Sequence, residues 1–195
     1  MRVIAAAFAA ILTATLLLPP AAHAQSRDYE VGGSSPFSTL FRYGGGGPGP
    51  IPRTLVDFRS NYKPGSIVVD TRARRLYLVL GNGEALQYGI GVGRDGFRFS
   101  GVHRVSMKRE WPDWTPPAQM LKRRPDLPRH MKGGPGNPLG ARALYLGSTL
   151  YRIHGTDEPE TIGQAVSSGC FRMVNEDVVD LYNRVQVGAS VYVKN

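Results

Sequence analysis

The sequence predicts a mainly β domain with one α-helix near its C-terminus. Short runs rich in β-branched and aromatic residues recur between residues 67 and 154, separated by glycine, proline or asparagine. An apolar stripe with helical spacing occurs at 175–187, after all of these runs. Because strands dominate and the helix comes late, we expect a mostly β architecture.

The expected strands begin as a meander. Residues 67–70 and 76–80 form the first two strands, and Asn82-Gly83 is a turn of the kind that joins hairpin strands. Residues 84–92 return as the third strand. Further strands are expected at 101–108, 143–146, 149–154 and 190–193.

Three alternating glycines end the third strand, at Gly89, Gly91 and Gly93. A glycine-rich nucleotide loop is followed by a helix, and no helical pattern follows here. We therefore expect β-bulges or close backbone approach at these positions.

A long proline-rich, basic loop over 110–136 holds both tryptophans, Trp111 and Trp114. Long ordered loops are usually functional, so one interpretation is a lid or groove wall that offers tryptophan faces to an extended substrate. The other interpretation is that the tryptophans plug the edge of the core.

The N-terminus has the parts of a secretory signal peptide. Arg2 precedes an apolar run over 3–18, two prolines end the run, and a small-x-small sequence follows at 22–24. We expect cleavage after residue 24, with an uncleaved anchor as the alternative, and no membrane span in the mature protein. Residues 25–52 are interpreted as a disordered Gly/Pro-rich linker and 53–195 as the folded domain.

The 195-residue chain has a formal net charge of +9. This charge suits a polyanionic partner such as anionic lipid or a carboxylate-rich cell wall, although solubility alone also explains it. Nucleic acid is not expected as a partner, because the longest basic run, Lys122-Arg123-Arg124, is interrupted at once by Pro125.

Cys170 is the only cysteine in the chain, and His154 is one of four histidines. A single cysteine in an exported protein cannot form an internal disulfide, so it is either a small buried apolar residue or a reactive thiol. An imidazole can take the proton of a thiol, and the thiolate attacks carbonyls. Gly169 permits a sharp turn, and its N–H with that of Cys170 can stabilise the oxyanion that forms. These residues predict acyl transfer.

The residues around this pair resemble the L,D-transpeptidases of the YkuD type. The resemblance depends on His154-Gly155-Thr156, on Gly163 and on the run SSGCFRM at 167–173, and it extends over most of residues 53–195. It implies a compact β-sandwich with the site in a cleft and one α-helix after the cysteine. In the family the position of Ser168 is often histidine.

The resemblance also implies roles for individual residues. Cys170 is the nucleophile, His154 is the proton acceptor and donor, the backbone carbonyl of Gly155 orients the His154 ring, and the Gly169 N–H faces the oxyanion. The candidate substrate-binding residues are Arg172, Ser168, Tyr145, Asn137 and Trp114. No metal and no cofactor are implied.

The implied substrate is a peptidoglycan tetrapeptide stem. The thiolate attacks the carbonyl that joins diaminopimelate to the terminal D-alanine, and an amine on another stem resolves the thioester into a 3→3 cross-link. Some family members use an outer-membrane protein or lipoprotein as the partner, or trim the stem. We expect a periplasmic monomer. The alternatives are an L,D-carboxypeptidase-type cysteine hydrolase and a non-catalytic cell-wall-binding module.

Two details of the site stay open at this point. Arg172 could hold a substrate carboxylate or pair with Asp177 at the start of the helix. The acidic residues at 157, 158 and 160 are interpreted as a solvated rim and not as partners of His154. A thiolate–imidazolium pair at rest would give an acylation rate that falls at both extremes of pH.

Overall fold

The computed structural model describes residues 49–94 and 99–195. The expected signal peptide at 1–24 and most of the expected linker at 25–52 lie outside the described residues. Within the described end of that linker, Ile51 lies against Gly89 and Gly163. The predicted boundary between linker and folded domain, at residues 52 and 53, stays a prediction.

The described residues form eleven strands, two α-helices and one 3₁₀-helix. The strands are β1 (Thr54–Asp57), β2 (Ile67–Asp70), β3 (Arg75–Gly81), β4 (Glu84–Gly89), β5 (Val92–Gly93), β6 (Gly101–Glu110), β7 (Arg142–Leu146), β8 (Arg152–His154), β9 (Ala165–Ser167), β10 (Phe171–Arg172) and β11 (Ser190–Lys194). The helices are α2 (Ala118–Arg123), α3 (Asn175–Arg184) and the 3₁₀-helix η2 (Pro159–Thr161).

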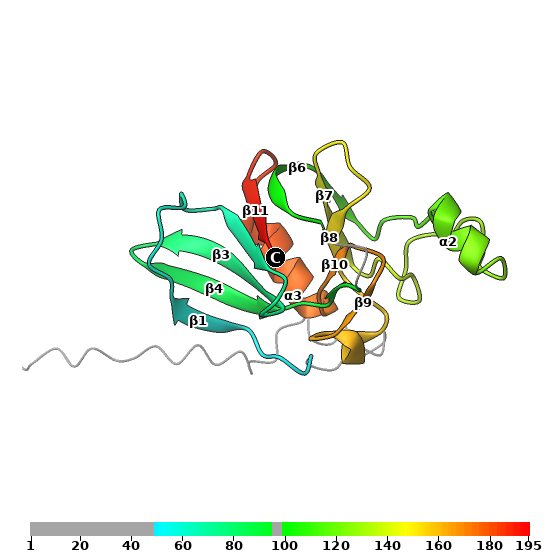
Figure 1. The fold of residues 1–195 in the computed structure, drawn as a ribbon, viewed down its shortest axis with the longest axis horizontal. Helices are drawn as coiled ribbons and strands as arrows, with labels where there is room; N and C mark the ends of the chain where they lie inside the picture. The colour runs from blue at the N-terminus through cyan, green and yellow to red at the C-terminus, as the bar shows by residue number, and fades with distance from the viewer. Residues whose placement is uncertain (1–48, 95–98) are drawn as a thin grey trace, which may run out of the picture. The chain divides into compact units, whose positions relative to one another are not determined.

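One nine-stranded sheet has the order β1-β4-β3-β2-β11-β6-β7-β8-β10, and β5 pairs with β9 in a second, two-stranded sheet (Figure 1). The long strand β6 joins two halves of the nine-stranded sheet. Its residues 101–104 pair with β11, and its residues from Val105 onward pair with β7, with a register shift between Val105 and Met107. Such an irregularity lets a strand bend, so β6 belongs to both halves.

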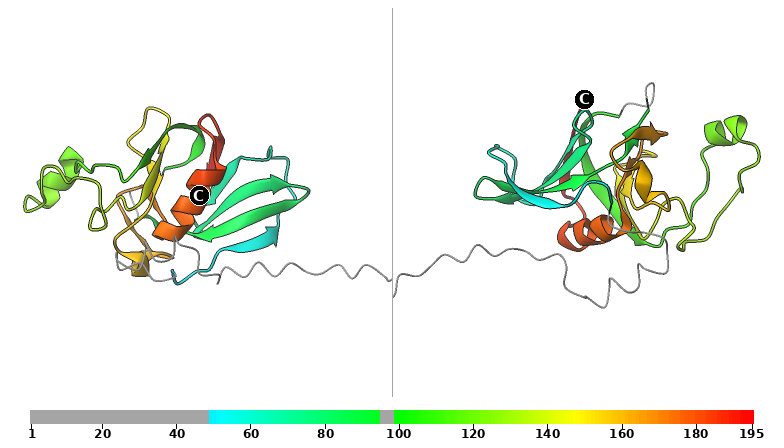
Figure 2. Two further views of the ribbon diagram at one scale, coloured as in Figure 1. Left: turned by 180° about the vertical axis from the view of Figure 1, so that it is seen from behind. Right: turned by 90° about the horizontal axis from the view of Figure 1, so that it is seen from below.

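Side chains from both halves meet in one hydrophobic core, which the bent sheet encloses in the manner of a sandwich. The fully buried members include Ile67, Leu76 and Tyr88 from the first half and Leu144, Ile153 and Phe171 from the second. Helix α3 lies where the halves meet (Figure 2). Asp180 of α3 accepts a 2.7 Å hydrogen bond from Tyr88 of β4, and Lys108 of β6 donates to the carbonyl of Val185 at 2.8 Å.

The expected mainly β fold with a helix after the cysteine is confirmed. The helix expected at 175–187 is shorter, because it ends at Arg184 and Val185 is extended. Helix α2, inside the long basic loop, was not expected; it follows two prolines and consists of good helix formers. Strands β1, β9 and β10 were not expected, and the strand expected at 84–92 is divided into β4 and β5.

The alternating glycines have the expected effect on the backbone. Gly91 exchanges backbone hydrogen bonds with Arg172, 2.9 Å in each direction, and a Cβ on Gly89 would collide with Ile51. Gly93 itself lies in β5, and no described residue between β5 and β6 is helical, in line with the expectation that these glycines do not form a phosphate-binding loop. Asn82 and Gly83 both have positive φ, as the expected hairpin turn requires.

Candidate active site

The register of β8 and β10 sorts their side chains onto two faces. The two strands run parallel, with Phe171 opposite Ile153 and Arg172 opposite His154. Ile153 and Phe171 are buried in the core, at 0% and 1% exposure. Because side chains alternate along a strand, His154 and Arg172 point to the other face. We call this the site face.

Cys170 comes directly before Phe171 of β10, and Phe171 pairs with Ile153 of β8. Arg152, directly before Ile153, pairs with Tyr145 of β7. The Cys170 Sγ lies 3.8 Å from the carbonyl oxygen of Leu150, two residues before β8. The residues selected from the sequence as nucleophile and base thus lie at the same short strand pair, His154 in β8 and Cys170 directly before β10.

The thiol of Cys170 is partly exposed. Its Sγ donates a weak hydrogen bond to the carbonyl of Leu150 at 3.8 Å. Burial raises the pKa of the Cys170 thiol, while the positive charges of Arg152 and Arg172 act in the opposite direction. At neutral pH the Cys170 sulfur is therefore a protonated thiol, and its partial exposure lets a substrate reach it.

The imidazole of His154 is buried and has a fixed orientation. Its Nδ1 lies 2.6 Å from the carbonyl oxygen of Gly155, and its exposure is 5%. A carbonyl can only accept, so Nδ1 carries the proton and Nε2 keeps a free lone pair. Burial lowers the pKa of His154 to about 3, and the nearby Arg172 and Arg152 also disfavour the imidazolium.

These pKa shifts revise the expected ion pair. Burial makes both the thiolate and the imidazolium unfavourable, so a neutral thiol beside a neutral imidazole is the favoured resting state. The arginine charges stabilise negative charge on sulfur and destabilise positive charge on the ring.

The turn before Cys170 is fixed by Ser167. The Ser167 hydroxyl accepts a 3.1 Å hydrogen bond from the Gly169 N–H and donates a 2.7 Å bond to the Cys170 carbonyl. Gly169 has a φ of +110°, a conformation that glycine adopts without strain. The Gly169 N–H, which we expected to face an oxyanion, is thus already bound to Ser167 in this structure.

Arg172 forms an ion pair, but its partner is not Asp177, the candidate named from the sequence. Its Nη1 lies 2.8 Å from Glu158 Oε2 and 3.4 Å from Thr161 Oγ1. The expected alternative, Asp177, lies 3.7 Å from Arg53 instead. Glu158 therefore balances the charge of Arg172, while the Gly155 carbonyl and no rim carboxylate orients the imidazole.

Tyr145 and Ser168, two of the candidate substrate-binding residues, each contact an arginine side chain. Tyr145 supports Arg152, whose guanidinium carbon is 5.0 Å from the centre of the Tyr145 ring. Ser168 accepts a hydrogen bond from Arg123 of α2 at 3.5 Å. The long basic loop thus contacts the turn that carries Cys170.

Asn137 and Trp114, two further candidate substrate-binding residues, are both buried. Asn137 is 1% exposed; it donates to the Lys132 carbonyl at 2.9 Å and accepts from the Leu139 N–H at 2.8 Å. Trp114 is 8% exposed and exchanges two 2.8 Å backbone hydrogen bonds with Met131. Both residues stabilise the long loop. The second interpretation, in which both tryptophans are buried, therefore fits Trp114 but not Trp111, which is 38% exposed.

Sequence reasoning gave no role to Asn175, which supports the His154 loop. Its buried amide accepts from the Ala141 N–H at 2.9 Å and donates to the Thr156 carbonyl at 3.0 Å. A Cβ at Gly140 or Gly155 would collide with Asn175 Oδ1, so both glycines make room for this amide. The arrangement fixes the segment whose Gly155 carbonyl holds the imidazole.

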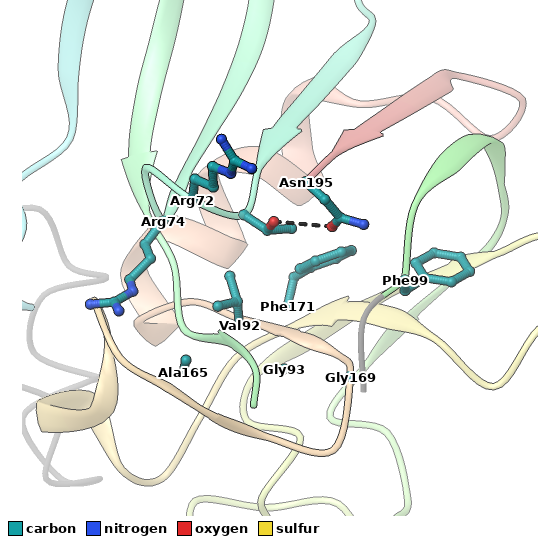
Figure 3. A pocket seen from close by; sticks show the side chains of 10 residues that line it. Arg72, Arg74, Val92, Gly93, Phe99, Ala165, Gly169, Phe171 and Asn195 are labelled. Atoms are coloured by element: carbon teal, nitrogen blue, oxygen red, sulfur yellow. Dashed lines mark hydrogen bonds between the residues drawn. The ribbon is translucent and has the colours of Figure 1, made fainter. Parts of the chain in front are cut away.

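A cavity of about 310 Å³ lies beside the turn that precedes Cys170. Arg72 and Arg74 from the β2–β3 connection, Val92 of β5 and Phe171 of β10 line it, together with Gly169 (Figure 3). Neither Cys170 nor His154 lines this cavity. The cavity therefore adjoins the candidate site but does not contain the reacting groups.

The described residues contain neither a cluster of metal-binding side chains nor a membrane-spanning helix. Over 49–94 and 99–195, no three His, Cys, Asp or Glu side chains lie close enough together to bind a metal ion. No helix in that part of the chain is long and apolar enough to cross a membrane.

Comparison with known protein families identifies the domain. Residues 64–193 match the model of the YkuD family, the L,D-transpeptidase catalytic domain, which is more than half of the chain. The chain belongs to this L,D-transpeptidase family. The matched residues include the whole site face and the turn that carries Cys170.

Similar proteins of the family come from several bacteria. The Escherichia coli K12 protein named probable L,D-transpeptidase ErfK/SrfK is 34% identical over 167 residues, covering 82% of this chain and 53% of that protein. Probable L,D-transpeptidase YbiS from the same strain is 35% identical over 147 residues, covering 72% and 47%. The chain thus spans about half the length of the curated relatives it matches.

Solved structures agree on the fold. An L,D-transpeptidase from Mycobacterium smegmatis superposes with a TM-score of 0.54 at 17% identity, covering 66% of this chain and 58% of that one, and shows the fold alone. A Brucella melitensis protein named probable carnitine operon oxidoreductase is 49% identical, with a TM-score of 0.51 and coverage of 72% and 91%.

Proposed function

We propose that this chain is a cysteine acyltransferase that forms a thioester with peptidoglycan tetrapeptide stems and passes the acyl group to an amine. The observation that carries the proposal is the geometry of the site face. His154 lies in β8 and Cys170 directly precedes β10, which pairs with β8, and the 2.6 Å contact between His154 Nδ1 and the Gly155 carbonyl leaves Nε2 as a base. Family membership and the names of the relatives support the same reaction class.

In the first half-reaction, Sγ attacks the carbonyl that joins the third residue of the stem to the terminal D-alanine. Nε2 of His154 takes the thiol proton as the C–S bond forms, and returns it to the D-alanine nitrogen as the C–N bond breaks. The site electrostatics suit this order, because a neutral imidazole is ready to accept a proton. The Cys170 N–H is the proposed oxyanion donor, since the Gly169 N–H is bound to Ser167.

In the second half-reaction, an amine of another stem attacks the thioester. His154 takes a proton from the amine, the new C–N bond forms, and the proton returns to the departing sulfur. The product is a 3→3 cross-link, or a wall-anchored outer-membrane protein or lipoprotein when its amine is the acceptor. We propose a periplasmic location, in line with the features of residues 1–24, and a monomer as the active form.

Tetrapeptide muropeptides test the proposal directly. Intact-protein mass spectrometry should show a thioester on Cys170 with loss of D-alanine, and product analysis should show cross-linked dimers. Cys170→Ala should abolish both, at least 10⁴-fold, while its melting temperature and its binding of the muropeptide persist. His154→Gln, which cannot accept and return a proton, is a second control.

The outcomes separate the candidate functions. Tripeptides without dimers would replace transfer by the L,D-carboxypeptidase alternative. Muropeptide binding without any thioester would indicate the non-catalytic wall-binding module. A thioester on the wild type that survives in His154→Gln at an unchanged rate would remove the imidazole from the mechanism.

A further inference from the structure

Three arginines of the described residues each have a buried guanidinium nitrogen without a hydrogen bond: Arg53, Arg142 and Arg152. A carboxylate balances the charge of the first two. Arg53 lies 3.0 Å from Asp180, and Arg142 lies 3.1 Å from Glu110. Arg152 forms no ion pair with any described residue. A partly buried cation without a counter-charge is costly, so this arginine has an unmet requirement.

The position of Arg152 places that requirement beside the nucleophile. Arg152 directly precedes Ile153 and Cys170 directly precedes Phe171, the residue paired with Ile153. The Cys170 Sγ lies 3.8 Å from the carbonyl oxygen of Leu150, two residues before Arg152. The guanidinium carbon of Arg152 is 5.0 Å from the centre of the Tyr145 ring. The other arginine near the sulfur, Arg172, already pairs with Glu158 at 2.8 Å. Of the two, only Arg152 has a charge that no described carboxylate balances.

We propose that Arg152 binds a carboxylate of the acyl donor, next to the carbonyl that Cys170 attacks. The inference rests on the proposed function and extends it, because it assigns the residue that recognises the charged part of the substrate. A guanidinium and a carboxylate form two parallel hydrogen bonds, which would engage the buried Nε of Arg152. The Tyr145 ring keeps the guanidinium oriented, which reduces the entropy lost on binding.

Two carboxylates of a tetrapeptide stem are close enough to the attacked carbonyl. One is the terminal carboxylate of D-alanine, and the other is the side-chain carboxylate of diaminopimelate. Both present the same planar acceptor to Arg152, so the proposal concerns their shared chemistry. Two synthetic stems, each with one of these carboxylates converted to an amide, distinguish the sources.

The kinetic test compares acylation rates of the wild type, Arg152→Gln, Arg152→Lys and the control Arg142→Gln. Arg142 is matched because it is also partly buried, has a buried Nε and lies near an aromatic ring, at 5.4 Å from Tyr182, but is balanced by Glu110. Arg152→Gln should raise KM for the unmodified stem about 10- to 100-fold, and Arg152→Lys should do so less. Arg142→Gln should change KM less than about 2-fold.

The amide stems complete the kinetic test. The wild type should lose affinity for the one stem whose recognised carboxylate is blocked, whereas Arg152→Gln should bind that stem and the unmodified stem alike. Equal KM values of wild type and Arg152→Gln for the unmodified stem would overturn the inference. If both proteins still formed the thioester on Cys170, the proposed function would stand without it.

A binding measurement keeps the two proposals separate. In Cys170→Ala, the NMR signal of the Arg152 Nε–H should shift when the unmodified stem is added, and should not shift with the amide stem of the recognised carboxylate. This result supports carboxylate binding even if the wild type forms no thioester, an outcome that would overturn only the proposed function. An unshifted signal with a stem that does bind would overturn the role of Arg152, whether or not the Arg152 variants fold.

Discussion

The two halves of the bent sheet are held together in different ways. On one side of β6, strands β3 and β4 pair over six residue positions and turn through Asn82 and Gly83. On the other side, β8 and β10 pair over only two. There the chain is fixed by buried side chains that bond to the backbone, chiefly Ser167 and Asn175.

From this difference we expect substitutions in the first half to affect stability alone and substitutions in the second half to affect the reaction rate as well. Many equivalent ladder bonds stabilise the first half, so a change there should lower the free energy of unfolding without moving the reacting groups. In the second half one amide or hydroxyl positions a catalytic segment. A change there should lower the reaction rate as well as the stability. Three predictions test this contrast.

The largest effect on rate is expected from Asn175→Asp. Aspartate still accepts from the Ala141 N–H but, when ionised, cannot donate to the Thr156 carbonyl, which leaves a buried acceptor unpaired at a cost of about 1–3 kcal/mol. The segment that orients His154 then loosens. We expect the acylation kcat to fall about 10- to 100-fold, with KM little changed, because a misplaced base affects the transition state.

Asn137→Asp is the matched control for that variant. Asn137 has the same two-ended amide contacts, but they join parts of the long loop instead of the His154 segment. Denaturant unfolding should show a similar loss of stability for both variants, and only Asn175→Asp should lose kcat. A kcat loss of equal size in Asn137→Asp would show that the effect is general loosening.

The two halves also differ in how much the sequence predicted. The hairpin followed from Asn82-Gly83 between two apolar runs, because its contacts are local. The pair of Cys170 and His154 was selected as the candidate nucleophile and base because its residue types are rare and chemically specific. Asn175 and Arg152 received no role, since theirs arise only when segments distant in sequence meet. The short pairing of β10 carries no periodicity long enough to recognise.

The second prediction concerns the pH dependence of stability. Burial lowers the pKa of His154 to about 3, against about 6.5 in an unfolded chain. Between these values the unfolded state binds more protons, so His154 lowers the free energy of unfolding by about 1.4 kcal/mol per pH unit as the pH falls. His154→Gln should remove this contribution and become relatively more stable on acidification.

The Asp177 carboxyl also titrates in this pH range, so the test uses the difference in free energy of unfolding between wild type and His154→Gln. Burial raises the pKa of Asp177 to about 6, so between about 3.8 and 6 it contributes a slope of opposite sign. Urea unfolding of wild type and His154→Gln at pH 5, 6, 7 and 8 cancels this shared term. The difference between the two proteins should grow below pH 6.5 and be constant above it. A difference independent of pH would mean that the folded His154 titrates normally.

The smallest effect, and the sharpest separation from activity, is expected from Gly83→Ala. Gly83 has a φ of +79°, and its added Cβ would meet only Arg59 at an ordinary 3.6 Å, so backbone strain is the main cost. The variant should lose about 1 kcal/mol, or about 2–4 °C in melting temperature, with acylation unchanged within about 2-fold. Gly136→Ala, where a Cβ meets nothing within 4 Å, is the control and should be neutral. Four strands, β2, β11, β6 and β7, separate β3 and β4 from β8. A rate loss in Gly83→Ala that exceeds its loss of stability would therefore show that the two halves do not act independently.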